Sequence, residues 1–258
     1  PIFDDEILKT IRSLDIEANI TLNNFIAMDV TIDKAELNAV LDKGKINLDN
    51  LTVVLDEGYL HSKAIVDFED DVWDYQLDLN TKNLQLNNII TPLAGFPVFT
   101  GMIRANNHLS TRGKSVHEII ENLNGNLDVN IIDGSIDGFN IAYFTCLALD
   151  YITLNFLSEE KKWEETSYFD NISLTGDINN GELRLYDIYG DLQLIKLMAK
   201  ADTNIIDNTF KANIYAEIYS QQTKALCDSL ESFKGYTLKV DCAGTYYDFQ
   251  LDTCRSEE

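Results

Sequence analysis

Residues 98–141 decide the fold, and they read VFTGMIRANNHLSTRGKSVHEIIENLNGNLDVNIIDGSIDGFNI. Alternating apolar residues predict a strand over 99–109, and a polar turn follows over 110–114. Ser115 and Glu118 have the spacing of a capping box, in which each side chain bonds the other residue's backbone amide. Apolar residues at helical spacing then predict one short helix.

Two further elements follow from the same stretch. Asn124 and Gly125 end the helix, because this pair favours a chain reversal. Leu127, Val129 and Ile131 alternate with polar residues and predict a second strand. The pair at 133–134, Asp-Gly, is a hairpin signal, so we expect this strand to end there. The stretch is therefore a short capped helix between two strands, followed by a hairpin.

Period-two alternation runs through most of the remaining chain, from Ile16 to Leu79 and from Phe169 to Leu251. Each expected strand has one apolar and one polar face, which is typical of antiparallel sheets. The alternation slips by one residue after Ile32 and again between Leu48 and Leu51. A slip would turn the apolar side chains over unless a bulge resets them, so we expect bulges and a curved sheet.

The fold class predicted is mainly β with a few short helices: one long, curved antiparallel sheet with helices on its concave face or at its end. Helical spacing marks 7–14, 84–93 and 221–233. The helix over 84–93 separates a front part, 1–95, from a back part, 96–258, and we expect the two to form one continuous unit. The most apolar segment, Phe139 to Leu157, contains Asp150 and two Asn residues, so we expect a helix packed on the sheet rather than a membrane span.

The composition of the chain limits the kinds of molecule that it can bind. The 258 residues carry 43 acids against 20 bases, a formal net charge of −23. Such a surface repels phosphate backbones, so we exclude nucleic acid as a partner. The apolar content of 45 % is too high for a disordered chain.

The four cysteines are Cys146, Cys227, Cys242 and Cys254. None lies in a C-x-x-C motif, which argues against a zinc or redox site. An even number fits one or two disulfides in an oxidising compartment, and three connectivities remain open. Buried free thiols are the alternative.

Motifs for catalysis or metal binding are lacking. The helix around His117 has Glu121 where a zinc-protease helix needs its second histidine. His61 and His108 lie in strand patterns at outward positions. No nucleophile elbow, phosphate loop or dinucleotide fingerprint occurs. We therefore expect no enzyme activity, no metal and no cofactor.

A family resemblance rests on three pieces of the first stretch: Gly113-Lys114-Ser115, Leu123-Asn-Gly125 and Asp133-Gly134-Ser-Ile136-Asp-Gly138. Their order and spacing resemble the C-terminal region of the AsmA family. The resemblance implies a repeating β-groove, apolar inside and polar outside, that holds or conducts phospholipid acyl chains between the inner and outer membranes. It also implies a monomer in the periplasm, anchored to the inner membrane by an N-terminal helix that this chain does not include, with envelope membrane proteins as further partners.

The expected groove lining is taken from the alternating apolar set. Its members are Ile16, Ile20, Val30, Val53, Val66, Leu77, Ile103, Val129, Ile131, Leu174, Leu185, Ile214 and Val240.

Three alternatives stay open. The same alternation would serve an ordinary sandwich core. The chain could be a periplasmic scaffold for outer-membrane protein biogenesis that uses exposed sheet edges and has no lipid path. It could also be an extracytoplasmic hydrolase, if polar groups converged in a pocket. The first two depend on whether the concave face is open or filled by residues 139–157.

Overall fold

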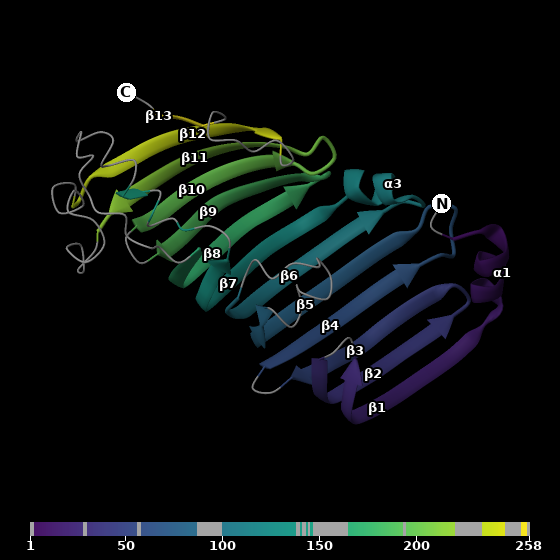
Figure 1. The fold of residues 1–258 in the computed structure, drawn as a ribbon. Coiled ribbons are helices and arrows are strands. Elements are labelled where there is room, and N and C mark those ends of the chain that lie inside the picture. The colour runs from purple at the N-terminus through teal and green to yellow at the C-terminus, as the bar shows by residue number, and fades with distance from the viewer. Residues whose placement is uncertain are drawn as a thin grey trace.

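A computed structural model describes residues 3–27, 30–55, 58–86, 100–137, 140, 143, 145–146, 165–192, 195–219, 234–245 and 254–256. Thirteen strands form one antiparallel sheet whose spatial order is the order along the chain. Figure 1 shows this sheet as an open, curved array with β1 at one edge and β13 at the other. The predicted fold class, one long curved antiparallel sheet with short helices, is confirmed.

The strands of the front part are long and continuous. They are β1 (Asp15–Ala27), β2 (Val30–Asp42), β3 (Lys45–Leu55), β4 (Gly58–Asp67), β5 (Asp74–Gln85) and β6 (Met102–Arg112). The later strands are β7 (Asn124–Asp137), β8 (Thr166–Asn179), β9 (Glu182–Leu192), β10 (Ile195–Asn204), β11 (Thr209–Ile218), β12 (Thr237–Thr245) and β13 (Cys254–Ser256).

The slip between Leu48 and Leu51 corresponds to an irregularity in the sheet, whereas the β1–β2 register continues unshifted across Ile32, where a bulge was also expected. Leu37 pairs with Leu51 and Ala39 pairs with Leu48, so β3 has one extra residue between Leu48 and Leu51. The register between β3 and β4 shifts at the same place. The extra residue keeps the apolar side chains of β3 on one face, as the sequence predicted.

Two helices are described, and both lie at the same ends of the strands, which we call the helix side of the sheet (Figure 1). Helix α1 (Asp5–Ser13) precedes β1, and helix α3 (Val116–Glu121) joins β6 to β7. Asp4 caps α1 by accepting a hydrogen bond from the amide of Ile7. The predicted capping box of α3 is present, with Ser115 and Glu118 each bonded to the other's amide.

Backbone hydrogen bonds join successive turns along the helix side. The amide of Phe68 donates to Gly44, and the amide of Gly113 donates to Trp73. Further along, Gly181 donates to Leu123, and Ile205 donates to Gly181. These bonds link turns from β2 to β11, so the helix side is a continuous structure rather than a row of separate hairpins.

The core lies near the strand ends. On the helix side, Leu8 of α1 packs with Phe68 and Trp73, and the rings of Phe68 and Trp73 meet edge to face with centroids 5.3 Å apart. Arg12 donates to the carbonyl oxygens of Phe68 (2.7 Å) and Asp70 (3.1 Å). Toward the opposite strand ends, Leu84 and Ile218 are almost completely buried. Both ends of the strands are therefore packed.

Two local predictions are wrong. The Asp133-Gly134 pair does not make a hairpin: Ile132 pairs with Asn171 and Gly134 pairs with Phe169, so β7 continues to Asp137. Asp133 has a φ of 50°, and a side chain on Gly134 would collide with the Phe169 ring and the Thr100 carbonyl. The expected helix over 84–93 does not begin at Leu84, which pairs with Ile103 as part of β5.

The structure does not describe the remaining expected helices. Residues 87–99, most of residues 139–157 and all of residues 221–233 lie outside the described residues. In the described part of the chain, no helix has the length and apolar character needed to cross a membrane.

Candidate functional site: the apolar face of the sheet

The register of the sheet aligns apolar side chains into rows that cross it from edge to edge. On β6, the alternate residues 103, 105, 107, 109 and 111 lie on one face, and each belongs to one row. We call the face made by these rows the apolar face and the other face the polar face.

One row has a member on every strand, and all of its members are apolar except Thr81 and Ser256. In order from β1 to β13 its members are Leu22, Ala35, Val53, Leu60, Thr81, Ala105, Val129, Leu174, Ile188, Ala199, Ile214, Val240 and Ser256. Thus five of the predicted lining residues, on β3, β7, β8, β11 and β12, share a single row.

The neighbouring rows contain seven more of the predicted residues. Leu77 pairs with Ala64 and Leu109, and Leu185 pairs with Gly176 and Ala201. The remaining five in these rows are Ile16, Ile20, Val66, Ile103 and Ile131.

Val30 is the one predicted residue outside these rows. It pairs with Ala27 at the far end of β1, beyond Asn24, whose φ is 51°. The structure therefore brings twelve of the thirteen predicted residues onto one face, and their role as a lipid lining stays a prediction.

The larger side chains in the middle of the apolar face are only half-buried. Leu60, Leu77, Val129 and Leu174 are all in this class. At the β1 edge, Ile16, Ile20 and Leu22 are 45–49 % exposed. A sandwich core would bury such residues, so this face is an accessible apolar surface that crosses the sheet.

The ends of the apolar face on the helix side are covered. Ile46, Val66 and Tyr75 belong to the row nearest α1, and all three pack against the Leu8, Phe68 and Trp73 cluster. The Tyr75 hydroxyl is buried without a hydrogen-bond partner, and burial raises the pKa of Tyr75. Helix α1 therefore closes one side of the face over β3 to β5.

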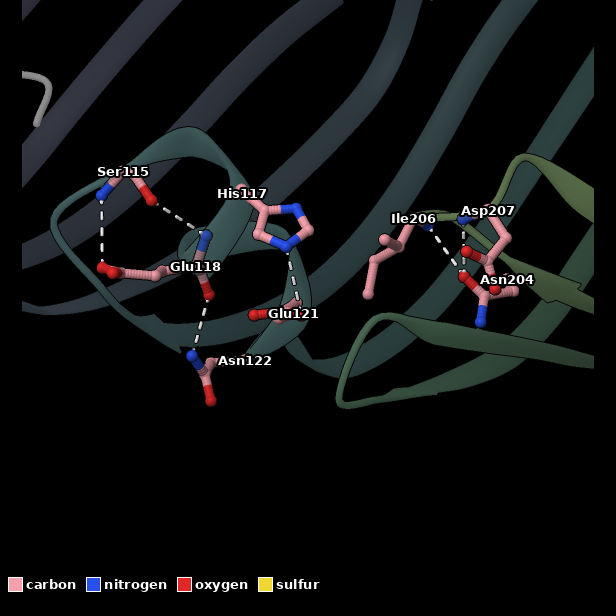
Figure 2. A network of polar contacts seen from close by, with 8 residues as sticks. All are labelled: Ser115, His117, Glu118, Glu121, Asn122, Asn204, Ile206 and Asp207. Atoms are coloured by element: carbon pink, nitrogen blue, oxygen red, sulfur yellow. Dashed lines mark hydrogen bonds and ion pairs between the residues drawn. The ribbon is translucent and has the colours of Figure 1, made fainter.

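Helix α3 continues this border. Thr111 is the last apolar-face residue along β6, and its hydroxyl donates to the carbonyl oxygen of Ile119. Figure 2 shows the capping box beside a second turn, where Asn204 Oδ1 accepts the amides of Ile206 and Asp207, both at 2.9 Å. The hydrogen bond from the Lys114 amide is the main cause of the lowered pKa of Glu118.

The polar face carries ion pairs rather than a reactive cluster. Examples are Arg112 with Asp74 (3.1 Å), Arg184 with Asp202 (2.9 Å) and His108 with Asp78 (2.6 Å). All six of these side chains are at least half exposed, so each pair contributes little to stability. Among the described residues, no three His, Cys, Asp or Glu side chains converge on a possible metal position.

A disulfide-bonded cysteine lies on the apolar face. Cys146 and Cys242 are both disulfide-bonded, and no free cysteine occurs in the described part of the chain. Cys242 is 3 % exposed and lies in a row of the apolar face, opposite Ala212 of β11. In the β12–β13 register the backbone of Cys254 lies opposite Cys242.

Sequence reasoning missed three polar residues within the apolar face. Ser62, Thr81 and Asn107 occupy row positions on β4, β5 and β6, and all three are buried. In the sequence, each of the three is only a polar residue at a position where the alternation expects an apolar one. This pattern does not show that the three residues lie close together.

An open antiparallel sheet with one accessible apolar face and helices along one side defines a β-groove type of protein. The family comparison agrees with this class, because the AsmA family model matches residues 3–188. The chain therefore belongs to the AsmA family. Neither a curated protein nor a solved structure matches it significantly.

Proposed function

We propose that this chain is the periplasmic part of an AsmA-like envelope protein and that its apolar face holds phospholipid acyl chains. The observation that carries the proposal is the set of apolar rows that cross the sheet, whose larger side chains are only half-buried. A surface of this extent in water needs an apolar partner. Acyl chains fit the requirement because each buried methylene contributes about 0.8 kcal/mol.

The proposed mechanism is passive. Acyl chains lie against the rows of the apolar face, while lipid headgroups stay in water. In this proposal the chain has a holding or conducting role between the two membranes and no catalytic one.

Three observations support the proposed compartment. The disulfide-bonded cysteines Cys146 and Cys242 fit an oxidising environment such as the periplasm. The net charge of −23 fits a part of the protein that stands away from anionic headgroups. Membership of the AsmA family supports a place in the cell envelope.

Native mass spectrometry of the gently purified chain, with lipid extraction from the same sample, tests the proposal. We expect co-purified phospholipid, and we expect it to be lost when Val129 and Ile131 are both changed to Asp. Met198→Asp is the matched control, because Met198 lies between two apolar-face residues of β10 but points to the polar face, where it is 45 % exposed.

The proposal is supported if the Met198→Asp protein retains lipid and the double variant loses it. The circular dichroism spectra of both variants should be unchanged. A lipid-free mass that stays unchanged after phospholipid is added would refute it. A scaffold role without a lipid path would then be the better account, and the free edge of β1 would be its docking strand.

A further inference from the structure

Three polar side chains interrupt the apolar face at one place. Ser62, Thr81 and Asn107 are 4 %, 7 % and 8 % exposed, respectively. They come from the adjacent strands β4, β5 and β6. Buried polar groups in proteins nearly always have hydrogen-bond partners. We therefore ask which group forms hydrogen bonds with these three side chains.

The register places the three groups around a single residue, Leu79. Ser62 and Asn107 are its two cross-strand partners, and Thr81 follows two residues later on the same face. Neighbouring strands lie about 4.8 Å apart and residues i and i+2 about 7 Å apart. The three polar groups therefore form a triangle with sides of roughly 8 to 10 Å, which we call the Leu79 triangle.

The hydrogen bonds within the triangle are incomplete. Thr81 Oγ1 is buried and has no hydrogen-bond partner. Asn107 Oδ1 accepts the backbone amide of Asp128 at 2.9 Å, which fixes the orientation of the side-chain amide. The triangle thus contains a hydroxyl whose hydrogen-bonding capacity is unused, and a neighbouring amide that is held in place.

The chemistry of the triangle indicates a neutral acceptor as its ligand. It contains hydroxyl and amide groups, and no charged residue occupies its positions in the rows. The charged neighbours Lys63, Asp78 and Lys82 occupy alternate positions on the polar face. A phosphate group would need cationic or multiple amide donors, whereas a carbonyl oxygen needs only one or two neutral donors.

We propose that the Leu79 triangle binds the ester carbonyl groups of a diacyl lipid on the apolar face. This inference rests on the proposed function and adds the part of the lipid that the protein recognises. The ester group lies where the acyl chains begin, so its capture at β4 to β6 would fix the depth of the lipid while the chains follow the apolar rows.

The test compares two lipids that differ only at this group: dioleoyl phosphatidylcholine and its dialkyl ether analogue, which lacks both carbonyls. Competition between them for the purified chain is measured by native mass spectrometry. We expect the wild-type protein to prefer the ester lipid by about fivefold to tenfold, the range that one net hydrogen bond supports. Thr81→Val, which keeps the side-chain shape, should abolish this preference without weakening ether binding.

Thr203→Val is the matched control. Thr203 Oγ1 is also buried without a partner, but it lies on the apolar face between Leu183 and Phe210, far along the sheet on β10. This variant should keep the ester preference. Ser62→Ala gives a second, independent reading and should reduce the preference in the same way as Thr81→Val.

The outcomes separate the two proposals. Equal binding of the two lipids by the wild-type protein would overturn the triangle and leave lipid holding intact. An equal loss in Thr81→Val and Thr203→Val would also overturn it, since any buried hydroxyl would then suffice. Binding of neither lipid would overturn the proposed function itself.

Discussion

Gly125 lies where β7 approaches the backbone of β6 closely. A Cβ placed on Gly125 would lie 2.1 Å from the carbonyl oxygen of His108 and 2.9 Å from a methyl group of Leu109. Backbone atoms cannot yield as the end of a long side chain can. A glycine at this position therefore allows the two strands to pair directly after α3.

Gly125→Ala should lower the free energy of unfolding by at least about 2 kcal/mol, because the sheet must open at β6 and β7 to admit the methyl group. Urea denaturation provides the measurement. Gly190→Ala is the control: Gly190 lies in a row of the same face, and the nearest atom to its added Cβ is 3.5 Å away. Equal effects of the two changes would contradict the argument from close approach.

Tyr219 provides a prediction on pH. Burial raises the pKa of Tyr219 above its ordinary value of 10.0, and the hydrogen bond to Asp191 and the charge of Asp191 raise it further. The folded protein thus keeps this proton at pH values where the unfolded chain releases it. The stabilisation is complete below pH 10.0 and is lost as the pH rises through the higher folded value.

Unfolding free energies measured between pH 8 and pH 11 should therefore fall more steeply for the wild-type protein than for Tyr219→Phe. The comparison with the variant removes the contributions of the other tyrosines and of the lysines. Parallel curves for the two proteins would show that Tyr219 titrates alike in the folded and unfolded states.

Among the elements, α1 is held on the sheet by the buried side chain of Leu8 and by the hydrogen bonds of Arg12. Leu8 is 6 % exposed and packs with Phe68 and Trp73, whereas its neighbour Ile7 is 46 % exposed. Leu8→Ala should cost about 2–4 kcal/mol of stability because it leaves a cavity beneath the helix. Ile7→Ala should cost less than about 1 kcal/mol.

Differential scanning calorimetry can measure both changes. A loss for Ile7→Ala as large as that for Leu8→Ala would mean that helix propensity, and not the cluster under the helix, holds α1 in place. The two residues are adjacent in one helix, so their difference reports the packing contribution.

The elements also show which features the sequence could predict. Alternation identified the strands, and the slip between Leu48 and Leu51 predicted an extra residue in β3, because a buried or apolar face fixes the phase of a strand. The capping box of α3 was predicted because it depends only on residues three apart. These features are all local.

The errors and omissions concern features that depend on distant partners. An Asp-Gly pair supports either a hairpin or a left-handed residue inside a strand, and at Asp133 the pairing with β8 selects the second. The Leu79 triangle combines residues from three strands, and only the register brings them together. A single strand pattern contains neither piece of information.

At the scale of the whole molecule, charge opposes folding. The net charge of −23 is spread over a sheet that has few close ion pairs among its described residues. Raising the salt concentration from 10 mM to 150 mM shortens the screening length from about 30 Å to about 8 Å. The thermal midpoint should rise by several degrees, because self-repulsion in the folded state is reduced.

Replacing sodium chloride by an uncharged osmolyte at equal osmolality separates screening from general solute effects. An unchanged or lower midpoint in salt would mean that attractive pairs such as Arg112 with Asp74 outweigh the repulsion.

Because the strands follow one another in strict sequential order, the number of hairpins sets the length of the sheet. Every strand pairs only with the strands before and after it in the chain, so a hairpin can be gained or lost without rerouting any connection. Each added hairpin lengthens the sheet by about 10 Å, since neighbouring strands lie about 4.8 Å apart. A gene that duplicates or deletes one hairpin unit would change the reach of the protein in fixed steps and leave its cross-section unaltered.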